Sequence, residues 1–407
     1  MQEEVASRGC QFSDKFICPN HVDDVVLKER ITENLFSSSC SFCERGGTED
    51  RPVAAAFDDF MDAFMVGVRN RFARAVDDAV PFSDGEFVVS TSHSHDVADE
   101  IFQEHAIRDY PDDSALAVLE EIQSVLLDDA WVRHGWQWPS DTERLRFSWD
   151  AFKQLVKHQS RFLFMNRPRR GTDQPDELSP VEFFEELADL LANEPGVCST
   201  LTANTPLYRA RTFECAQDLS ELPVTEVFPP PATLCRSSNR MSPAGISMFY
   251  GASDAGTALL EVSAHNTEQH AVVGEFRMAR DILVIDMTAL PELPSIFEED
   301  SAPRYDTVMF LKRFAEDLAL PIQLDGREHI EYVPTQVFTE YLRYAFPGDP
   351  PDGMVFSSAR AVGINYVLFG GPEIVAVQGN HRAEHMITID PALLTAYHLG
   401  WQPDFGA

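Results

Sequence analysis

Residues 246–262 read Ile246-Ser247-Met248-Phe249-Tyr250-Gly251-Ala252-Ser253-Asp254-Ala255-Gly256-Thr257-Ala258-Leu259-Leu260-Glu261-Val262. The apolar run 246–250 favours a strand, and the small residues that follow it are typical of a turn. Asp254 stands where a helix N-cap is expected, so residues 255–262 should be helical. Glu261 then lies two turns into this helix among apolar neighbours, where a carboxylate is either solvated or held in a cleft. A strand, a turn and a helix in succession predict a mixed α and β domain.

Residues suited to binding phosphate lie on both sides of this stretch. Segment 206–210 alternates like a strand, which directs Tyr208 and Arg209 to opposite faces and puts Arg211 on the same face as Arg209. Taken singly, each such residue is more often a surface or core residue than a site residue. Their combination suits a pocket for a phosphate-bearing nucleotide. The full series is Tyr208, Arg209, Arg240, Tyr250, Glu261, Pro334-Thr335-Gln336, Ser357, Ser358 and Asn365.

With its flanking segments, this series resembles the RES domain, a family of NAD-degrading toxins named after an Arg, a Glu and a Ser. The resemblance extends over about residues 205–377 and is carried by segments 207–211, 239–250, 257–262, 331–336 and 363–369. It implies a fold like that of the ADP-ribosyltransferase toxins. It also implies cleavage of NAD+ by hydrolysis or phosphorolysis, and some members are described as ADP-ribosylating a protein. Such toxins are commonly short and paired with an antitoxin, whereas here about 200 residues precede the domain.

The resemblance also assigns roles to residues. Arg209 corresponds to the first arginine of the family and Arg240 to the second, and both would bind NAD+. Tyr250 corresponds to the pocket tyrosine and Glu261 to the catalytic acid. Two choices stay open: Arg211 competes with Arg209, and either serine of the pair can be the one that names the family. The NAD-binding set implied is Arg209, Arg240, Tyr250, Ser357, Ser358 and Asn365, with Glu261, Arg209 and Tyr250 as catalytic residues.

These residue types suit the reaction. Nicotinamide departs readily from NAD+, so the site has to hold the ribose and stabilise the positive charge that develops on it. One carboxylate near the ribose suits such an oxocarbenium-like transition state. Arginines suit the pyrophosphate because they make paired, charge-assisted hydrogen bonds. The sequence has no Gly-x-Gly-x-x-Gly motif, so NAD+ is expected as a substrate and not as a redox cofactor.

Composition excludes several classes of partner. The formal net charge of −34 disfavours nucleic acids and anionic membranes, which both need dense positive charge. A hydrophobic fraction of 44% is that of a globular protein. No apolar run is long enough for a membrane span, and the first residues do not resemble a signal peptide. These features together predict a cytoplasmic protein.

Two close pairs of metal-binding residues occur near the amino terminus. Cys18 and His21 are separated by two residues, as are Cys40 and Cys43, and eighteen residues lie between the pairs. Each pair can supply two ligands to a tetrahedral zinc ion while the intervening chain returns. Four protein ligands would close the site, so the zinc is expected to be structural. Free thiols are the alternative. The remaining cysteines are expected to be ordinary thiols: Cys10, Cys198, Cys215 and Cys235.

The segment after this knuckle is mainly helical. Apolar residues recur three and four positions apart from Phe57 through Phe64 to Phe72, and segments 114–127 and 149–164 show the same period. A zinc-like knuckle followed by helices resembles the HEPN/RES amino-terminal module. HEPN domains that cleave RNA have a His four to six residues after an Arg, and no such pair occurs here, so no ribonuclease centre is expected. His93 and His95 would share a face if their segment is extended, and they could then bind a metal together with His105. No fourth ligand is recognisable, so a polar surface loop is expected there instead.

The sequence therefore predicts an α+β protein: a mainly α-helical amino-terminal domain with a zinc knuckle, then a mixed α/β, ADP-ribosyltransferase-like RES domain. The expected domains are 1–50 (zinc knuckle), 51–165 (HEPN-like), 166–204 (linker and amphipathic helix Pro180–Asn193), 205–377 (RES) and 378–407 (a tail packed on the RES domain).

The expected function is that of a toxin-like NAD+ glycohydrolase or phosphorylase. A protein ADP-ribosyltransferase and an inactive partner-binding module are the alternatives. An antitoxin or regulatory protein is the expected partner besides NAD+, and a homo-oligomer is left open.

Overall fold

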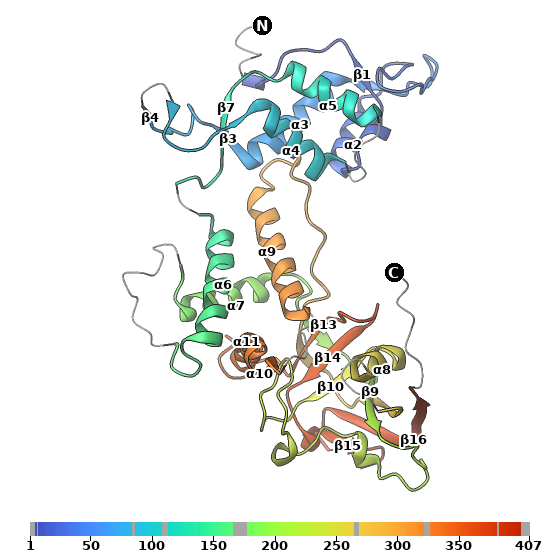
Figure 1. The fold of residues 1–407 in the computed structure, drawn as a ribbon. Coiled ribbons are helices and arrows are strands. Elements are labelled where there is room, and N and C mark those ends of the chain that lie inside the picture. The colour runs from blue at the N-terminus through green and yellow to red at the C-terminus, as the bar shows by residue number, and fades with distance from the viewer. Residues whose placement is uncertain are drawn as a thin grey trace. The chain divides into compact units, whose positions relative to one another are not determined.

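The computed structural model describes residues 5, 7–83, 86–107, 113–137, 139–165, 177–263, 268–320, 326–380 and 382–399. The chain divides into two compact units, each built from two separate segments (Figure 1). Unit 1 comprises Met1–Thr142 and Glu292–Met309, and unit 2 comprises Glu143–Pro291 and Phe310–Ala407.

Unit 1 is mainly helical, with short strands at its edges. Strands β1 and β2 pair antiparallel, β3, β7 and β6 form a second small sheet, and β4 pairs with β5. In chain order its elements are β1 (Phe16–Ile17), η1 (Pro19–His21), α2 (Val25–Glu33), β2 (Ala55–Ala56), α3 (Phe57–Arg71), β3 (Phe72–Arg74), β4 (Phe82–Ser83), β5 (Glu86–Phe87), β6 (Ser92–His93), α4 (Ser94–Ile101), the π-helical turn η2 (Phe102–Ala106), α5 (Asp113–Val125) and β7 (Ala130–Arg133).

Helix α3 forms the centre of this unit. The apolar stripe expected from the sequence is confirmed, since Phe57, Phe60, Phe64 and Val68 are all fully buried. Residues from the distant segment 292–309 complete the same core. Phe297 stacks on Phe64, with ring centroids 5.9 Å apart. Burial of this apolar surface stabilises the unit.

In the described part of the chain, nine strands of unit 2 form one mixed sheet in the order β15-β16-β11-β9-β10-β14-β13-β12-β8. Pairs β12–β13 and β15–β16 are parallel, and the other neighbours are antiparallel. The strands are β8 (Cys198–Leu201), β9 (Pro206–Phe213), β10 (Phe249–Ala252), β11 (His270–Met278), β12 (Ile282–Asp286), β13 (Gly353–Ser357), β14 (Ile364–Leu368), β15 (Val375–Val377) and β16 (Ile387–His398).

Helices and short turns surround this sheet. They are α6 (Asp141–His158), α7 (Pro180–Asn193), α8 (Ala255–Ser263), α9 (Ala302–Ala319), α10 (Glu328–Glu331) and α11 (Val333–Tyr344), with η3 (Val224–Val227), η4 (Ala232–Leu234) and η5 (Pro372–Ile374). Helix α9 begins in the segment assigned to unit 1 and ends in the segment assigned to unit 2.

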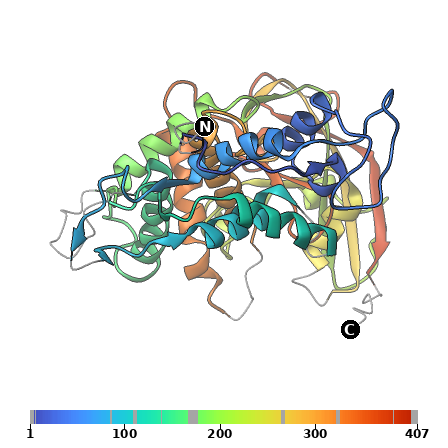
Figure 2. The same cartoon turned by 90° about the horizontal axis from the view of Figure 1, so that it is seen from above.

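Different apolar clusters cover different parts of the sheet. Aromatic side chains of α6, α7, α9 and α11, among them Trp149, Phe183 and Phe338, form the largest cluster with strands β12 to β14. A second cluster joins β9, β11 and β16, where the red strand β16 runs beside a yellow strand that lies far from it in sequence (Figure 2). Helix α8 packs on small residues of β9 and β10, including Ala210 and Ala252. Alanines there allow the helix to approach the sheet closely.

Several expected elements are confirmed, and two are corrected. Helix α7 has the predicted bounds, and Ser179 caps it by accepting from Glu182 N. Strand β10 begins at Phe249 and not at Ile246, because Ile246 N donates to Pro243 O in a turn. Helix α6 covers Asp141–His158, so it begins and ends earlier than predicted.

The domain boundaries stay predictions, but the compact units divide the chain at other positions. Residues 143–165, expected in the helical domain, lie in unit 2. Residues 387–398, expected in a tail, form strand β16 within the sheet. The linker residues 166–176 lie outside the described residues. Among the described residues, no helix combines the length and apolar character that a membrane span needs.

Candidate functional site

Glu261 belongs to helix α8, and this helix packs against strands β9 and β10 (Figure 1). The helix begins as expected, since Asp254 Oδ1 accepts from Thr257 N at 2.8 Å. Two donors from other elements converge on one carboxylate oxygen. Ser358 Oγ lies 2.6 Å from Glu261 Oε1, and Asn365 Nδ2 lies 2.7 Å from the same atom. Within the described part of the chain, the other carboxylate oxygen, Oε2, has no hydrogen-bond partner.

The turn between β13 and β14 fixes Ser358. Its amide donates to Gly363 O at 2.9 Å, and its hydroxyl accepts from Arg360 N and Ala361 N at 3.1 and 3.2 Å. Because both acceptor positions of the hydroxyl are used by the turn, its proton is directed to Glu261. Ser357, by contrast, is exposed. The structure therefore brings Ser358, and not Ser357, to Glu261.

Gly363 lets this turn approach the start of α8. A Cβ atom at this position would overlap Thr257 Oγ1 and lie 2.8 Å from Asp254 Oδ2. Two hydrogen bonds between Ser253 and Ile364 close the same junction, one from each amide. Glycine is therefore required for the close approach, which fixes Ser358 with respect to α8.

Arg240 lies in a segment without helix or strand. Its Nη1 donates to Leu318 O at 2.9 Å, and its guanidinium carbon lies 5.8 Å from the centroid of the Tyr332 ring. Burial lowers the pKa of Arg240, while Tyr332 and Glu261 oppose this effect. Arg240 is thus close enough to Glu261 for their charges to interact.

Tyr250 is the next member of the group. Its hydroxyl oxygen lies 2.8 Å from Ser242 Oγ, and burial raises its pKa to about 12. The phenol therefore stays neutral at physiological pH and acts as a hydrogen-bonding group. Ser242 was not expected from the sequence; it lies in segment 239–250, but nothing in the local pattern identifies it as the partner of a tyrosine eight residues away.

The structure separates Arg209 from Arg211. Arg209 Nε donates to Val227 O at 3.1 Å and its Nη1 to Tyr250 O at 2.9 Å, and burial lowers its pKa to about 10. Arg211 is exposed and pairs with Glu226, with 2.6 Å between Nη1 and Oε2. Arg209 is therefore the arginine that contacts β10, whereas Arg211 makes a surface ion pair.

The expected site residues thus lie on neighbouring elements, but only some of them contact Glu261. Glu261, Ser358 and Asn365 are joined by hydrogen bonds. Arg240 is close enough to Glu261 for the carboxylate to raise the pKa of the guanidinium against the effect of burial. Arg209 lies against the main chain of Tyr250 and the ring of Phe249, and its contacts do not include Glu261.

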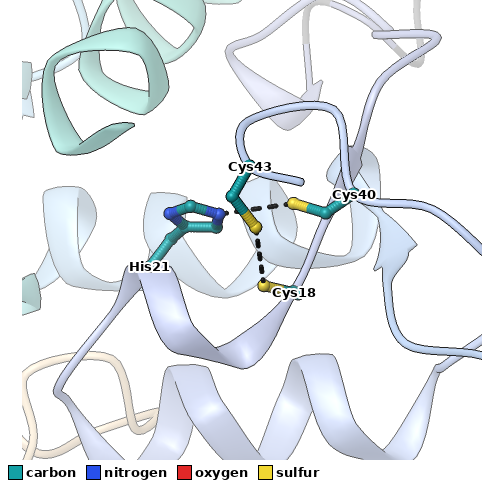
Figure 3. A group of neighbouring side chains, drawn as sticks. All are labelled: Cys18, His21, Cys40 and Cys43. Carbon is teal, nitrogen blue, oxygen red and sulfur yellow. Dashed lines mark hydrogen bonds between the residues drawn. The ribbon is translucent and has the colours of Figure 1, made fainter. Parts of the chain in front are cut away.

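A second group lies in unit 1, where Cys18, His21, Cys40 and Cys43 converge from two segments (Figure 3). Their ligand atoms all lie within 4.8 Å of one another. The two sulfurs of Cys18 and Cys43 are 3.7 Å apart, and Cys40 Sγ is 3.3 Å from His21 Nε2. This arrangement can hold a metal ion. The other cysteines lie elsewhere, with Cys10 buried, Cys215 exposed, and Cys198 and Cys235 half-buried.

His93 and His95 do not join a metal group among the described residues. His93 ends strand β6 and is the N-cap residue of α4, and His95 lies in the first turn of that helix, so the two residues do not lie on one face of an extended segment. His105 is partly enclosed beside Tyr305, and burial lowers its pKa to about 4. It is therefore a neutral packing residue near pH 7.

Comparison with protein families identifies both halves of the chain. Residues 206–387 match the RES domain, and residues 33–170 match the HEPN/RES N-terminal domain 1. The chain therefore contains a RES domain preceded by this amino-terminal domain. The RES domain indicates an NAD-acting toxin.

Other comparisons add little. A search of curated proteins gave no match. Among solved structures, the chain is similar to one from the M. tuberculosis MbcT-MbcA toxin-antitoxin complex, at 13% identity and a TM-score of 0.27. The match covers 53% of this chain and 92% of the other. A TM-score of this size does not define a shared fold.

Proposed function

We propose that this protein cleaves the nicotinamide–ribose bond of NAD+, as a glycohydrolase or a phosphorylase, on an ADP-ribosyltransferase-like RES domain. The observation that carries the proposal is the fixed carboxylate of Glu261. Ser358 and Asn365 both donate to Oε1. The proposal assigns Oε2, which has no partner among the residues that the structure describes, to contact with the ligand. A carboxylate held in this way suits a site that must hold a ribose hydroxyl and stabilise positive charge as the bond breaks.

In this proposal Glu261 is the catalytic residue. Bond cleavage releases neutral nicotinamide, which keeps the electron pair of the broken bond, and leaves an oxocarbenium-like ribosyl group. Glu261 stabilises that charge, and the oxygen of water or phosphate then attacks the anomeric carbon and loses its proton to solvent. Ser358 and Asn365 orient the carboxylate through two short hydrogen bonds, and Tyr250 packs on the base and ribose.

Arg240 and Arg209 are assigned to the pyrophosphate. Each uses part of its guanidinium on main-chain carbonyls, Arg240 on Leu318 and Arg209 on Val227 and Tyr250. These bonds restrict the side chains before a ligand arrives, so less conformational entropy is lost when the remaining nitrogens bind phosphate oxygens.

We further propose that the group of Cys18, His21, Cys40 and Cys43 binds a structural zinc ion. Sulfur ligands about 2.3 Å from a tetrahedral zinc lie about 3.8 Å apart. The spacing of 3.7 Å between the Cys18 and Cys43 sulfurs is close to this value. Zinc would link the loop that contains Cys40 and Cys43 to the start of unit 1.

A protein partner that restrains the enzyme, such as an antitoxin, is part of the same proposal and has its support in the RES family.

The products distinguish the proposed reaction from its alternatives. The purified protein is incubated with NAD+, with and without phosphate, and the products are separated by chromatography. ADP-ribose identifies water as the acceptor, and a phosphorylated ADP-ribose identifies phosphate. Nicotinamide release only in the presence of an added protein, which becomes labelled, would replace the proposal by protein ADP-ribosylation. Absence of release under all conditions would refute it.

A further inference from the structure

The main chain around Arg240 needs support from other elements. In the described structure, residues 235–248 contain neither helix nor strand, apart from turns and bends. Arg240 binds one neighbouring carbonyl, that of Leu318, through Nη1. An arginine that is to bind an anion from such a segment has to be held by contacts that fix its backbone as well.

Helix α11 supplies these contacts. Thr335 Oγ1 donates to the carbonyl oxygen of Arg240, and Gln336 Nε2 donates to Asn239 O at 2.8 Å. Both polar side chains are 7% exposed. Buried hydroxyl and amide groups are retained where they satisfy a specific partner, because an unpaired one costs stability. Here the partners are two successive carbonyls of the segment that carries Arg240.

The same contacts also connect to the guanidinium group. Thr335 Oγ1 lies 2.9 Å from Tyr332 O, and the ring of Tyr332 lies near the guanidinium of Arg240. The hydroxyl has one proton, which it shares between these two carbonyls, so its oxygen lies between the backbone of Arg240 and the residue whose ring lies near the guanidinium. The start of α11 thus holds Arg240 at its carbonyl and at its guanidinium.

We propose that Thr335 and Gln336 are positioning residues that hold Arg240 for the phosphate groups of an adenine dinucleotide. They act through Arg240 and do not touch the ligand. The inference rests on the proposed assignment of Arg240 to the pyrophosphate. It goes beyond that assignment because it makes α11 the element that sets affinity for the anionic part of the substrate.

Binding of ADP and adenosine tests this role. The two ligands share the nucleoside and differ in the phosphates, so the ratio of their dissociation constants reports phosphate binding alone. A residue that only stabilises the fold would change both constants together. The measurement is isothermal titration calorimetry on the full-length chain, since neither ligand has the nicotinamide–ribose bond and neither can turn over.

Four variants and one reference define the outcome. Arg240→Gln is the reference for loss of the phosphate contribution. Thr335→Val and Gln336→Leu should each lower the preference for ADP by about tenfold, the effect of one hydrogen bond of ordinary net strength. Thr335→Ser keeps the hydroxyl and should keep the preference. Thr339→Val is the matched control, since Thr339 is a buried hydroxyl one turn further along α11 that donates to Thr335 O of its own helix, contacts Met241 Sδ and does not contact Arg240.

Preference for ADP that survives in both Thr335→Val and Gln336→Leu would overturn the inference. Equal weakening of ADP binding and adenosine binding in these variants would also overturn it. So would a wild-type protein that binds ADP and adenosine with the same affinity. The outcome is independent of catalysis. Dependence of ADP preference on Thr335 in a protein that releases no nicotinamide would support this inference and refute the proposed reaction.

Discussion

Ser358 Oγ lies 2.6 Å from Glu261 Oε1, although the two residues are 97 positions apart in the chain. The hydroxyl accepts two amide protons of its own turn, so its single proton is directed to the carboxylate. Asn365 donates to the same oxygen from the next strand. The relationship shows how a helix and a turn together fix one acidic side chain.

Replacing Ser358 should slow the reaction. Ser358→Ala removes a hydrogen bond to a carboxylate, which contributes about 1.5–3 kcal/mol. The expected loss in kcat is therefore about 10- to 100-fold. Ser357→Ala is the matched control, because Ser357 is exposed and should stay within about twofold of wild type. Steady-state rates of nicotinamide release check the prediction, and equal effects of the two substitutions would contradict it.

Gly363→Ala should disturb the junction between the β13–β14 turn and α8. The new methyl group would overlap Thr257 Oγ1, and we expect a destabilisation of about 1–3 kcal/mol together with reduced activity. Gly46→Ala is the control, since a Cβ at Gly46 meets no atom within 4 Å. Urea denaturation measures both variants. A Gly363→Ala protein as stable and active as wild type would show that the turn accommodates a side chain.

Arg209 and Arg211 should respond differently to lysine. A lysine at position 209 cannot bind Val227 O and Tyr250 O together, so one buried carbonyl loses its partner. The expected cost is about 1–3 kcal/mol of unfolding free energy. Arg211→Lys keeps a surface ion pair and should change stability by less than about 0.5 kcal/mol. The opposite order of stabilities in urea would reverse the assignment of the two arginines.

Metal analysis tests the Cys/His group. The purified chain should contain about one zinc ion, because the four ligands form one closed tetrahedral set. Cys40→Ser should remove the metal and lower the melting temperature of unit 1, since metal binding contributes to folding. Cys215→Ser should do neither, because Cys215 is exposed and lies outside the group. Full thermal stability of a metal-free protein would contradict a structural role.

Local features could be predicted from the sequence. The start of α7 follows from Ser179, Pro180 and Glu182, which form a capping box with a proline in the first turn. Asp254 similarly marks the start of α8. The spacing of Cys18, His21, Cys40 and Cys43 predicted a group that the structure brings together. In each case the signal lies within a few residues or in a known ligand spacing.

Non-local features could not be predicted in this way. The choice of Ser358 depends on the register of β13 with β14 and on the packing of Gly363 against α8. The choice of Arg209 depends on where η3 returns to the strand, because both arginines share one strand face. The packing of Phe297 against α3 joins segments more than 200 residues apart, and no local pattern encodes such a pairing.

The measurement that tests the account most directly compares wild type and Glu261→Gln for release of nicotinamide from NAD+. Glutamine keeps the size of the side chain and removes the carboxylate. The account predicts that wild type releases nicotinamide and that the variant is about 100- to 1,000-fold slower, with an unchanged melting temperature. Equal rates for the two proteins would contradict the assignment of Glu261 as the catalytic residue.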